Sequence, residues 1–264
     1  MASRLQGKTA VVVGAGQSPG DTLGNGRAMA ILFAREGAEV FCVDRDQARA
    51  ADTVEAILAE GGTASAFAAD IAKADHCEAL VAAAKVSLGR IDILCNNVGI
   101  GGGGDGPAHR LSEEAFDRIF AVNLKGMWQT VKEVIPLMRE QGGGSIINTS
   151  SLASTSGGNQ MAYEVSKAAV NRLTTSVAQS NAKHGVRCTA LMMGFMDTPM
   201  AVAGIARATG RPIEEVRAQR DAMVPLGGKM GTAWDTAYAA LFFASDESKF
   251  ITGAVLPIDG GMGL

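Results

Sequence analysis

Short apolar runs alternate with longer stretches of helical periodicity along the whole chain. The apolar runs are rich in β-branched residues and span about five residues each, which is typical of strands buried in a sheet. They predict strands at 9–13, 39–43, 65–69, 92–96, 145–149, 186–192 and 254–258. Between these runs, apolar residues recur at helical spacing and predict helices at 27–36, 47–60, 74–88, 112–139, 162–184 and 232–245.

This alternation predicts the fold class. Strands that alternate with helices of this length form βαβ units, and such units build a parallel sheet. Right-handed crossovers then place helices on both faces of the sheet. No linker, repeat or change of composition divides the 264 residues, so we expect one α/β domain.

The segment 200–224 departs from the pattern. It is polar and rich in arginine, and it follows the C-terminal end of a predicted strand. Open parallel sheets bind ligands at that edge, so the segment is predicted to be a helical lid. Its arginines either meet an acidic substrate or form solvated faces of an amphipathic helix, and the second alternative is favoured. They are Arg207, Arg211, Arg217 and Arg220.

Composition excludes several classes of function. The net charge is −3, with 24 basic and 27 acidic residues intermixed, so no basic patch is expected to bind nucleic acid. No apolar run reaches the roughly 18 residues of a membrane span, and no signal peptide is visible. The four cysteines form no CxxC pair and the three histidines lie far apart. We therefore expect reduced thiols, no metal site and a cytoplasmic location.

A glycine-rich turn follows the first predicted strand, with the sequence GAGQSPGDTLGNG at 14–26. Glycines let the backbone approach a pyrophosphate, and a helix N-terminus offers unpaired N–H groups and a positive dipole. Asp44 ends the second predicted strand. A carboxylate there can bind both ribose hydroxyls of adenosine and would repel a 2′-phosphate. Alternatively, Asp44 caps the following helix.

A second motif, YEVSK at 163–167, lies in the predicted helix 162–184. Tyr163 and Lys167 are four residues apart and therefore share one face of that helix. An ammonium group beside a phenol lowers the phenol pKa, and a tyrosine tuned in this way can exchange a proton with an alcohol or carbonyl oxygen. Upstream, the strand GSIINTSS ends in two serines, one of which can hydrogen-bond the same oxygen.

In this order and spacing the motifs resemble the short-chain dehydrogenase/reductase family, in its shorter single-domain branch. The resemblance covers almost the whole chain and includes AADI at 68–71, NNVG at 96–99, VNLKG at 122–126, GFMDTPM at 194–200 and ITGAVLPIDGG at 251–261. It implies one Rossmann-like, doubly wound domain over 1–264 with a seven-stranded parallel sheet. It also implies a homotetramer, built through the two longest helices and the C-terminal strand.

The resemblance further implies a role for each matching residue. Tyr163 would be the general acid/base, Lys167 would bind the nicotinamide ribose and lower the tyrosine pKa, and Ser151 would hold the carbonyl oxygen. Asn123, at a bend in its helix, would anchor a water that links Lys167 to solvent. Besides Tyr163 and Lys167, the expected cofactor contacts are Gly14, Gly24, Asn25, Gly26, Asp44, Asp70, Ile71, Asn97, Gly99 and Thr198. Asp44 indicates NAD as the cofactor.

Three departures from the family pattern leave questions open. The usual TGxxxGxG motif is six residues longer here, and the insertion either covers the adenosine half of the cofactor, touches a neighbouring subunit or is an exposed bulge. Alignment of the strand favours Ser151 as the catalytic serine, whereas the spacing to Tyr163 favours Ser150. The usual Pro-Gly after the sixth strand reads Met193-Gly194.

We therefore expect NAD-dependent interconversion of a secondary alcohol and a ketone, an EC 1.1.1 activity. A lyase or epimerase of the extended branch would be longer. An NAD(H)-binding sensor on the same fold is the main alternative, although such proteins tend to lose the tyrosine or the lysine. A substrate of modest polarity is suggested by the apolar residues near the motifs, namely Ile100, Leu152, Met161, Phe195 and Met196.

Overall fold

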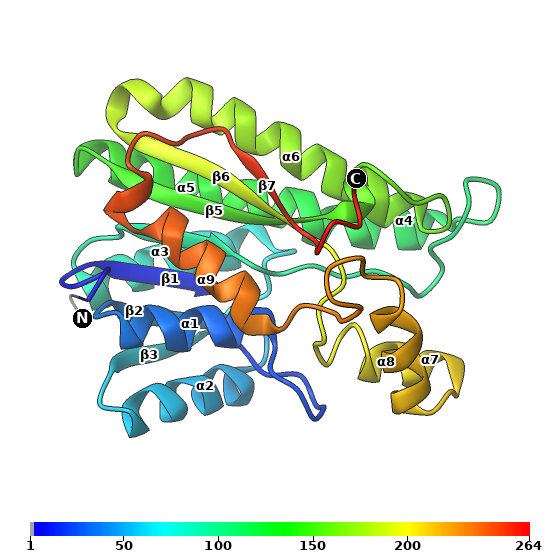
Figure 1. The fold of residues 1–264 in the computed structure, drawn as a ribbon. Helices are drawn as coiled ribbons and strands as arrows, with labels where there is room; N and C mark the ends of the chain where they lie inside the picture. The colour runs from blue at the N-terminus through cyan, green and yellow to red at the C-terminus, as the bar shows by residue number, and fades with distance from the viewer. Residues whose placement is uncertain (1–2) are drawn as a thin grey trace.

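A seven-stranded parallel sheet lies at the centre of the computed structural model, which describes residues 3–264 (Figure 1). The strands are β1 (Thr9–Val13), β2 (Glu39–Asp44), β3 (Thr63–Ala68), β4 (Ile93–Asn96), β5 (Gly144–Ser151), β6 (Val186–Met193) and β7 (Val255–Ile258). Their order in the sheet is β3-β2-β1-β4-β5-β6-β7, and every neighbouring pair is parallel. The order reverses direction between β1 and β4, which is where doubly wound sheets open a ligand crevice. The predicted fold class is confirmed.

Helices cover both faces of the sheet (Figure 1). They are α1 (Asn25–Arg35), α2 (Gln47–Ala59), α3 (Ala74–Leu88), α4 (Glu113–Phe120), α5 (Met127–Glu140), α6 (Met161–Asn181), α7 (Ala203–Thr209), α8 (Ile213–Asp221) and α9 (Ala233–Ala244). One core joins α1, α2 and α9 to the sheet, and a second joins α3, α5 and α6 to the opposite face.

The burial of β1 shows why an uninterrupted apolar run forms a central strand. All five of its residues are buried. Successive side chains on a strand point to opposite faces. Accordingly, Ala10 and Val12 join the core with α1, whereas Val11 and Val13 join the core with α3. A strand covered on both faces needs apolar residues at every position, and this is the pattern that TAVVV shows.

The predicted helix 112–139 is interrupted. Its first part is α4 and its last part is α5, and a π-helical turn over Ala121–Gly126 connects them. π-Helical turns inside α-helices frequently mark functional sites. The predicted lid contains α7 and α8, which pack on each other through Val202, Ala206 and Val216.

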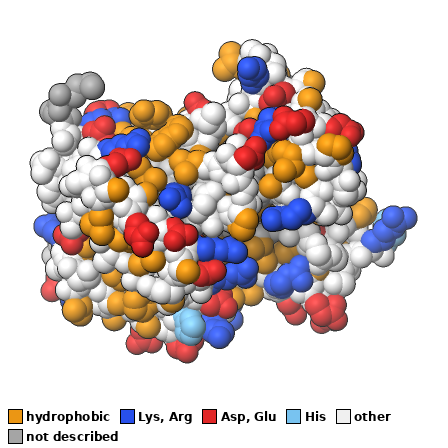
Figure 2. Space-filling view, turned by 90° about the horizontal axis from the view of Figure 1, so that it is seen from below, with side chains coloured by type: hydrophobic (Ala, Val, Ile, Leu, Met, Phe, Trp, Pro, Cys, Tyr) orange, Lys and Arg blue, Asp and Glu red, His pale blue; other side chains and the backbone are white. Residues whose placement is uncertain are grey.

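The surface carries charges of both signs. On the face shown in Figure 2, basic and acidic side chains are interspersed. The four cysteines are buried and unpaired, and burial raises the pKa of Cys42, Cys95 and Cys188 to about 12. Within residues 3–264, no helix combines the length and apolar character that a membrane crossing requires.

Candidate active site

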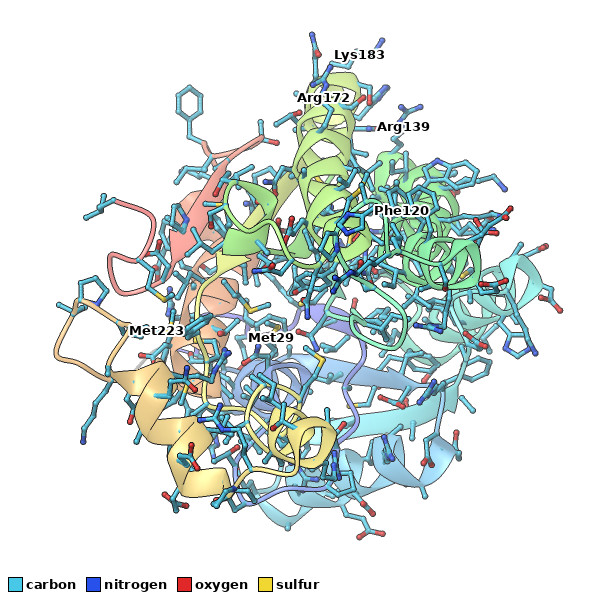
Figure 3. All side chains as sticks on the ribbon, turned by 90° about the vertical axis from the view of Figure 1, so that its right-hand side faces the viewer. Met29, Phe120, Arg139, Arg172, Lys183 and Met223 are labelled. Atoms are coloured by element: carbon cyan, nitrogen blue, oxygen red, sulfur yellow. The ribbon has the colours of Figure 1, made fainter. Side chains whose placement is uncertain are left out.

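The carboxyl ends of the parallel strands bring the predicted site residues to one edge of the sheet. In chain order, the strand ends carry Gly14, Asp44, Asp70 with Ile71, Asn97 with Gly99, Ser151 and Thr198. Figure 3 looks onto this edge, with the lid and Met223 at the lower left and α6, which carries the labelled Arg172, at the top. The site therefore lies between α6 and the lid.

The glycine-rich turn packs tightly against the start of α1. Gly14 has a φ of +84°, and a Cβ at Gly26 would overlap the carbonyl oxygen of Gly14. Asn97 Nδ2 donates to that same oxygen at 3.1 Å. The N-cap Gly24 supplies no side-chain hydrogen bond, and Asn25 Oδ1 is buried without a partner among the described residues. The unpaired N–H groups of the open first turn of α1 fit the pyrophosphate of a dinucleotide. Asn25 Oδ1 is a hydrogen-bond acceptor and so does not itself suit an anion.

Asp44 points its carboxylate toward the same turn. Oδ2 accepts from the N–H of Gly16 at 3.1 Å, and Oδ1 accepts from the N–H of Asp46 at 3.1 Å. A Cβ at Gly16 would lie 2.5 Å from Asp44 Oδ2, so only glycine leaves this approach open. The cap of α2 is Asp46, which accepts from the N–H of Ala48 at 3.0 Å. Capping of the next helix therefore falls to Asp46 and not to Asp44.

Three other predicted cofactor contacts lie just after β3 (Asp70 and Ile71) and just before the lid (Thr198). Asp70 Oδ1 accepts from the N–H of Ala72 at 3.0 Å, and the Asp70 N–H donates to His76 Nδ1 at 3.1 Å. Ile71 and Thr198 are buried. Their contacts with a cofactor stay predictions. Within residues 3–264, no group of three or more His, Cys, Asp or Glu side chains is placed to hold a metal ion.

Ser151 and Ser150 end β5 but point in opposite directions. Burial raises the pKa of Tyr163, and a hydrogen bond with the Ser151 side chain acts to lower it. Ser150 is fully buried, and its Oγ donates to the carbonyl of Lys167 at 3.2 Å. The structure thus brings Ser151 to the phenol and turns Ser150 into the core. The catalytic role of Ser151 stays a prediction.

Lys167 is buried next to Tyr163. Its Nζ donates to the carbonyl of Thr149 at 2.9 Å and lies 5.8 Å from the centroid of the Tyr163 ring. A Cβ at Gly99 would lie 2.9 Å from this Nζ, so glycine leaves room for the ammonium. Burial lowers the pKa of Lys167 to about 8. Burial raises the pKa of Tyr163 in this structure. The expected lowering of that pKa by Lys167 stays a prediction.

Asn123 lies in the π-helical turn and is fully buried. Its Oδ1 accepts from the N–H of Ile100 at 2.8 Å, and its Nδ2 donates to the Ile100 carbonyl at 2.9 Å and to Ser166 Oγ at 3.0 Å. The side chain therefore joins the loop after β4 to α6. The helix is interrupted at this position by the π-helical turn, and the predicted bend and water stay predictions.

Known proteins share this sequence and this fold. Residues 21–263 match the family model described as enoyl-(acyl carrier protein) reductase. The 3β-hydroxysteroid dehydrogenase 1 of Eggerthella lenta is 37% identical over 263 residues, 98% of this chain and 95% of that protein. A crystal structure assigned as a short-chain dehydrogenase/reductase from Burkholderia xenovorans has a TM-score of 0.90 at 38% identity, covering 99% of this chain and 98% of that one. The chain belongs to the short-chain dehydrogenase/reductase family.

A further solved structure of this family carries ligands. The 7α-hydroxysteroid dehydrogenase complexed with NADH and 7-oxo glycochenodeoxycholic acid has a TM-score of 0.85 and 30% identity, covering 98% of this chain and 96% of that one. Short-chain dehydrogenases/reductases are oxidoreductases that bind nicotinamide cofactors and act on small molecules. The glycine-rich turn, Asn25 and Asp44 are the residues of this chain that fit such a cofactor.

The six-residue insertion of this short-chain dehydrogenase/reductase packs against its own lid. Gln17 closes the inserted loop, because its Oε1 accepts from the N–H of Gly24 at 3.0 Å and its Nε2 donates to the Thr22 carbonyl at 2.9 Å. A Cβ at Gly20 would lie 2.8 Å from Pro199 Cβ. Sequence reasoning missed this contact, since the partner segments are far apart in the chain.

Arg217 of α8 completes the contact between the inserted loop and the lid. It forms ion pairs with Asp21 of the loop at 2.8 Å, with Asp197 before the lid at 2.9 Å, and with Glu214. Arg211 pairs with Glu215 at 2.9 Å. The charges of Arg211 and Arg217 are thus neutralised within the chain, which removes both from the set of arginines open to an acidic substrate.

We expect Arg217→Gln to loosen the lid. The Arg217 side chain is only 18% exposed, so its loss leaves Asp197 without its partner in a partly desolvated position. Amide hydrogen exchange in 200–224 should become about tenfold faster. The matched control is Arg211→Gln, which removes an exposed i,i+4 pair worth about 0.3–0.5 kcal/mol. Equal exchange rates in both variants and the unaltered protein would contradict a latching role for Arg217.

Proposed function

We propose that this protein is an NAD-dependent dehydrogenase/reductase that interconverts a secondary alcohol and a ketone. One observation carries the proposal. Tyr163 lies beside the buried ammonium of Lys167, and Ser151, at the end of β5, is close enough to the phenol to influence its pKa. These groups lie at the edge where a doubly wound sheet binds its ligands. Two hydroxyls that converge on one point can hold a single substrate oxygen, and the tyrosine can move its proton.

The cofactor fits the residues of the strand edge. The backbone N–H groups of the first turn of α1, which begins at Asn25, would hold the pyrophosphate. Asp44 would bind the adenosine ribose and Lys167 the nicotinamide ribose. When bound, the nicotinamide supplies the site that accepts or donates a hydride. Binding of the substrate and transfer of the proton are then carried out by side chains of this protein.

Ser151 and Tyr163 would bind the oxygen of the substrate through their hydroxyl groups. In oxidation, the phenolate of Tyr163 removes the proton of the alcohol. In reduction, the phenol gives a proton to the carbonyl oxygen. A charged Lys167, whose Nζ lies 5.8 Å from the centre of the phenol ring, would favour the phenolate and so support the oxidation direction.

The choice of NAD over NADP rests on Asp44. Its carboxylate is held beside the glycine-rich turn, where the charge would repel the 2′-phosphate of NADP. We expect tighter binding of NADH than of NADPH, and Asp44→Ala should narrow that gap by about tenfold or more. Fluorescence titration of both cofactors measures it. Asp46→Asn is the matched control, since Asp46 caps α2. Tighter binding of NADPH by the unaltered protein would refute the assignment.

The activity itself is tested by NADH production from NAD. The panel comprises secondary alcohols, diols, sugar alcohols, hydroxy acids and hydroxysteroids, because the relatives described above include two hydroxysteroid dehydrogenases. Turnover on one class supports the proposal. Tight NADH binding without turnover would favour the second candidate, a protein that senses NAD(H). The intact pair of Tyr163 and Lys167 supports the enzyme.

The pocket residues give a partial guide to the substrate. Leu152 and Met196 are 9% and 5% exposed, so core packing explains their apolar character. Met161, at the start of α6, is 37% exposed, so its side chain can contact a ligand. This supports a substrate of modest polarity without naming it. The four buried, unpaired cysteines support the expected reducing, cytoplasmic setting.

A homotetramer is the assembly that we propose. The surface of α4 and α5 exposes Phe116 and Trp128, beside a groove of about 650 Å³. At the other end, Phe250 before β7 is fully exposed, and Tyr238 on α9 is more than half exposed. Exposed aromatic side chains both at α4 and α5 and on α9 and the segment before β7 support two kinds of subunit contact, as a tetramer requires. Sedimentation equilibrium measures the assembly state.

A further inference from the structure

The first turn of α6 is capped by a carboxylate from a distant loop. Asp105 lies in the glycine-rich segment between β4 and α4. Its Oδ1 accepts from the N–H of Ala162 at 3.0 Å, and its Oδ2 accepts from the N–H of Tyr163 at 3.0 Å. Gln160, which precedes the helix, supplies no side-chain cap. Asp105 therefore satisfies two of the open N–H groups of α6, one of which belongs to Tyr163 itself.

The segment that carries Asp105 needs to be held in place. Gly102, Gly103 and Gly104 have φ values of +71°, +53° and +92°, a run of backbone that loses much entropy when it becomes ordered. Asn123 holds the segment at Ile100, and Asp105 holds its other end on α6. The segment then lies alongside the phenol ring, since a Cβ at Gly101 would stand 3.4 Å from Tyr163 Cδ2.

A second carboxylate holds the loop before α6. Glu164 Oε1 accepts from the N–H groups of Gly158 at 2.8 Å, Asn159 at 3.1 Å and Gln160 at 3.0 Å. Burial acts to raise the pKa of Glu164, but these three hydrogen bonds outweigh it and keep the pKa below its usual value. The loop is shaped around this oxygen, because a Cβ at Gly157, whose φ is +145°, would overlap Glu164 Oε1.

We propose that Asp105 and Glu164 are positioning residues that fasten the two substrate-side loops to the first turn of the helix bearing Tyr163. Asp105 fixes the tyrosine and the loop against its ring. Glu164 fixes 157–160, the wall between β5 and α6. The proposal rests on the proposed function, in which Tyr163 exchanges the substrate proton, and it predicts a different kinetic effect for each carboxylate.

Asp105→Asn should act mainly on kcat. An amide has one acceptor oxygen where the carboxylate has two, so one N–H of the helix loses its partner and the first turn shifts. A small displacement of a reacting group can cost up to about 10²-fold, and we expect kcat to fall about tenfold or more. The KM of the substrate and the dissociation constant of NADH should change little. Asp105→Glu should lose less activity than Asp105→Asn, because it keeps both acceptor oxygens on a side chain one methylene longer.

Glu164→Gln should act mainly on KM. Glutamine keeps one acceptor oxygen but loses the charge that strengthens its hydrogen bonds to three N–H groups. The segment 157–160 should therefore loosen while Tyr163 keeps its cap, so KM should rise about fivefold or more with kcat nearly unchanged. The matched control is Glu114→Gln, which changes an exposed carboxylate in the first turn of α4. That variant should behave as the unaltered protein in kcat, KM and NADH binding.

Amide hydrogen exchange tests the same contacts without any turnover. Asp105→Asn should speed exchange at Ala162 and Tyr163, and Glu164→Gln should speed it at 158–160. If no substrate of the panel is turned over, the proposed function fails, and the exchange rates alone decide the proposal made here. Unchanged exchange in both variants overturns it. Unchanged kcat and KM in both variants, in an active enzyme, overturn it as well. Should Asp105→Asn fail to fold, Asp105→Glu and Glu164→Gln carry the same readouts.

Discussion

Replacing Tyr163 by phenylalanine is expected to lower turnover by about 10²-fold or more, with NADH binding nearly unchanged. The substitution removes one oxygen and keeps the ring that packs beside Gly101. It also removes the group that exchanges a proton with the substrate. Ser151 cannot replace it, because an alcohol is a far weaker acid than a phenol. The measurement is kcat for NADH production, together with the dissociation constant of NADH.

The chain provides a matched control for this variant. Its other tyrosine, Tyr238, is 57% exposed on α9, far along the chain from the site. Tyr238→Phe should leave kcat unchanged. Ser151→Ala should lower kcat, whereas Ser150→Ala should lower stability through the lost hydrogen bond to the Lys167 carbonyl. Full activity of Tyr163→Phe would refute the assignment of the general acid/base.

The fold could be predicted because the burial of each helix and strand determines the spacing and the length of its run of apolar residues. In β1 every residue is buried, so TAVVV is apolar throughout. The first residue of β3 was harder to predict, because none of the residues in this strand is fully buried and the strand starts with the polar Thr63. The prediction at 65–69 begins two positions after Thr63, where the strand starts. The π-helical turn Ala121–Gly126 leaves no mark on the apolar pattern, because it alters hydrogen bonding and not burial.

The site could be predicted where strands determine it. Residues at the carboxyl ends of parallel strands meet at one edge whatever the loops do. Neighbouring residues on a strand face opposite sides, so only one of Ser150 and Ser151 can face the phenol. The sequence could not decide which, because the loop between β5 and Tyr163 differs in length from the family pattern. The hydrogen bond from Ser150 to the Lys167 carbonyl decides the direction.

The loop contacts could not be predicted. Asp105 reaches Tyr163 across 58 positions, and Asp21 reaches Arg217 across 196. Both depend on the path of a glycine-rich segment, and glycine permits many paths. The sequence did indicate that Glu164 could bind nearby N–H groups, because it directly follows Tyr163 and therefore lies in the first turn of α6. Recognising it as the partner of 158–160 required the conformation of Gly157 and Gly158.

Replacing Lys167 by methionine is expected to abolish most turnover and to stabilise the protein at neutral pH. Lys167 is 2% exposed, and burial lowers its pKa from the usual 10.5 to about 8. At about 1.4 kcal/mol per pKa unit, the buried ammonium costs about 3 kcal/mol at pH 7. Methionine fills a similar volume but leaves the Thr149 carbonyl without its donor, which costs about 1–3 kcal/mol. The net gain should be about 1 kcal/mol, or about 2–4 °C in Tm.

The pH dependence distinguishes this explanation from simple repacking. A lysine whose pKa is lower in the folded protein binds a proton less readily there than in the unfolded chain. The free-energy cost of burying the ammonium is therefore fully present below a pH of about 8, and it disappears as the pH rises toward 10.5. The stabilisation of the Lys167→Met variant relative to the unaltered protein should shrink over that pH range. Near pH 10.5 the variant should be the less stable of the two, because its Thr149 carbonyl still lacks a hydrogen-bond donor. Lys85→Met, at an exposed position of α3, is the control and should show no such dependence. A constant difference between pH 7 and pH 10, measured by denaturant unfolding, would contradict the assignment of a desolvated ammonium at Lys167.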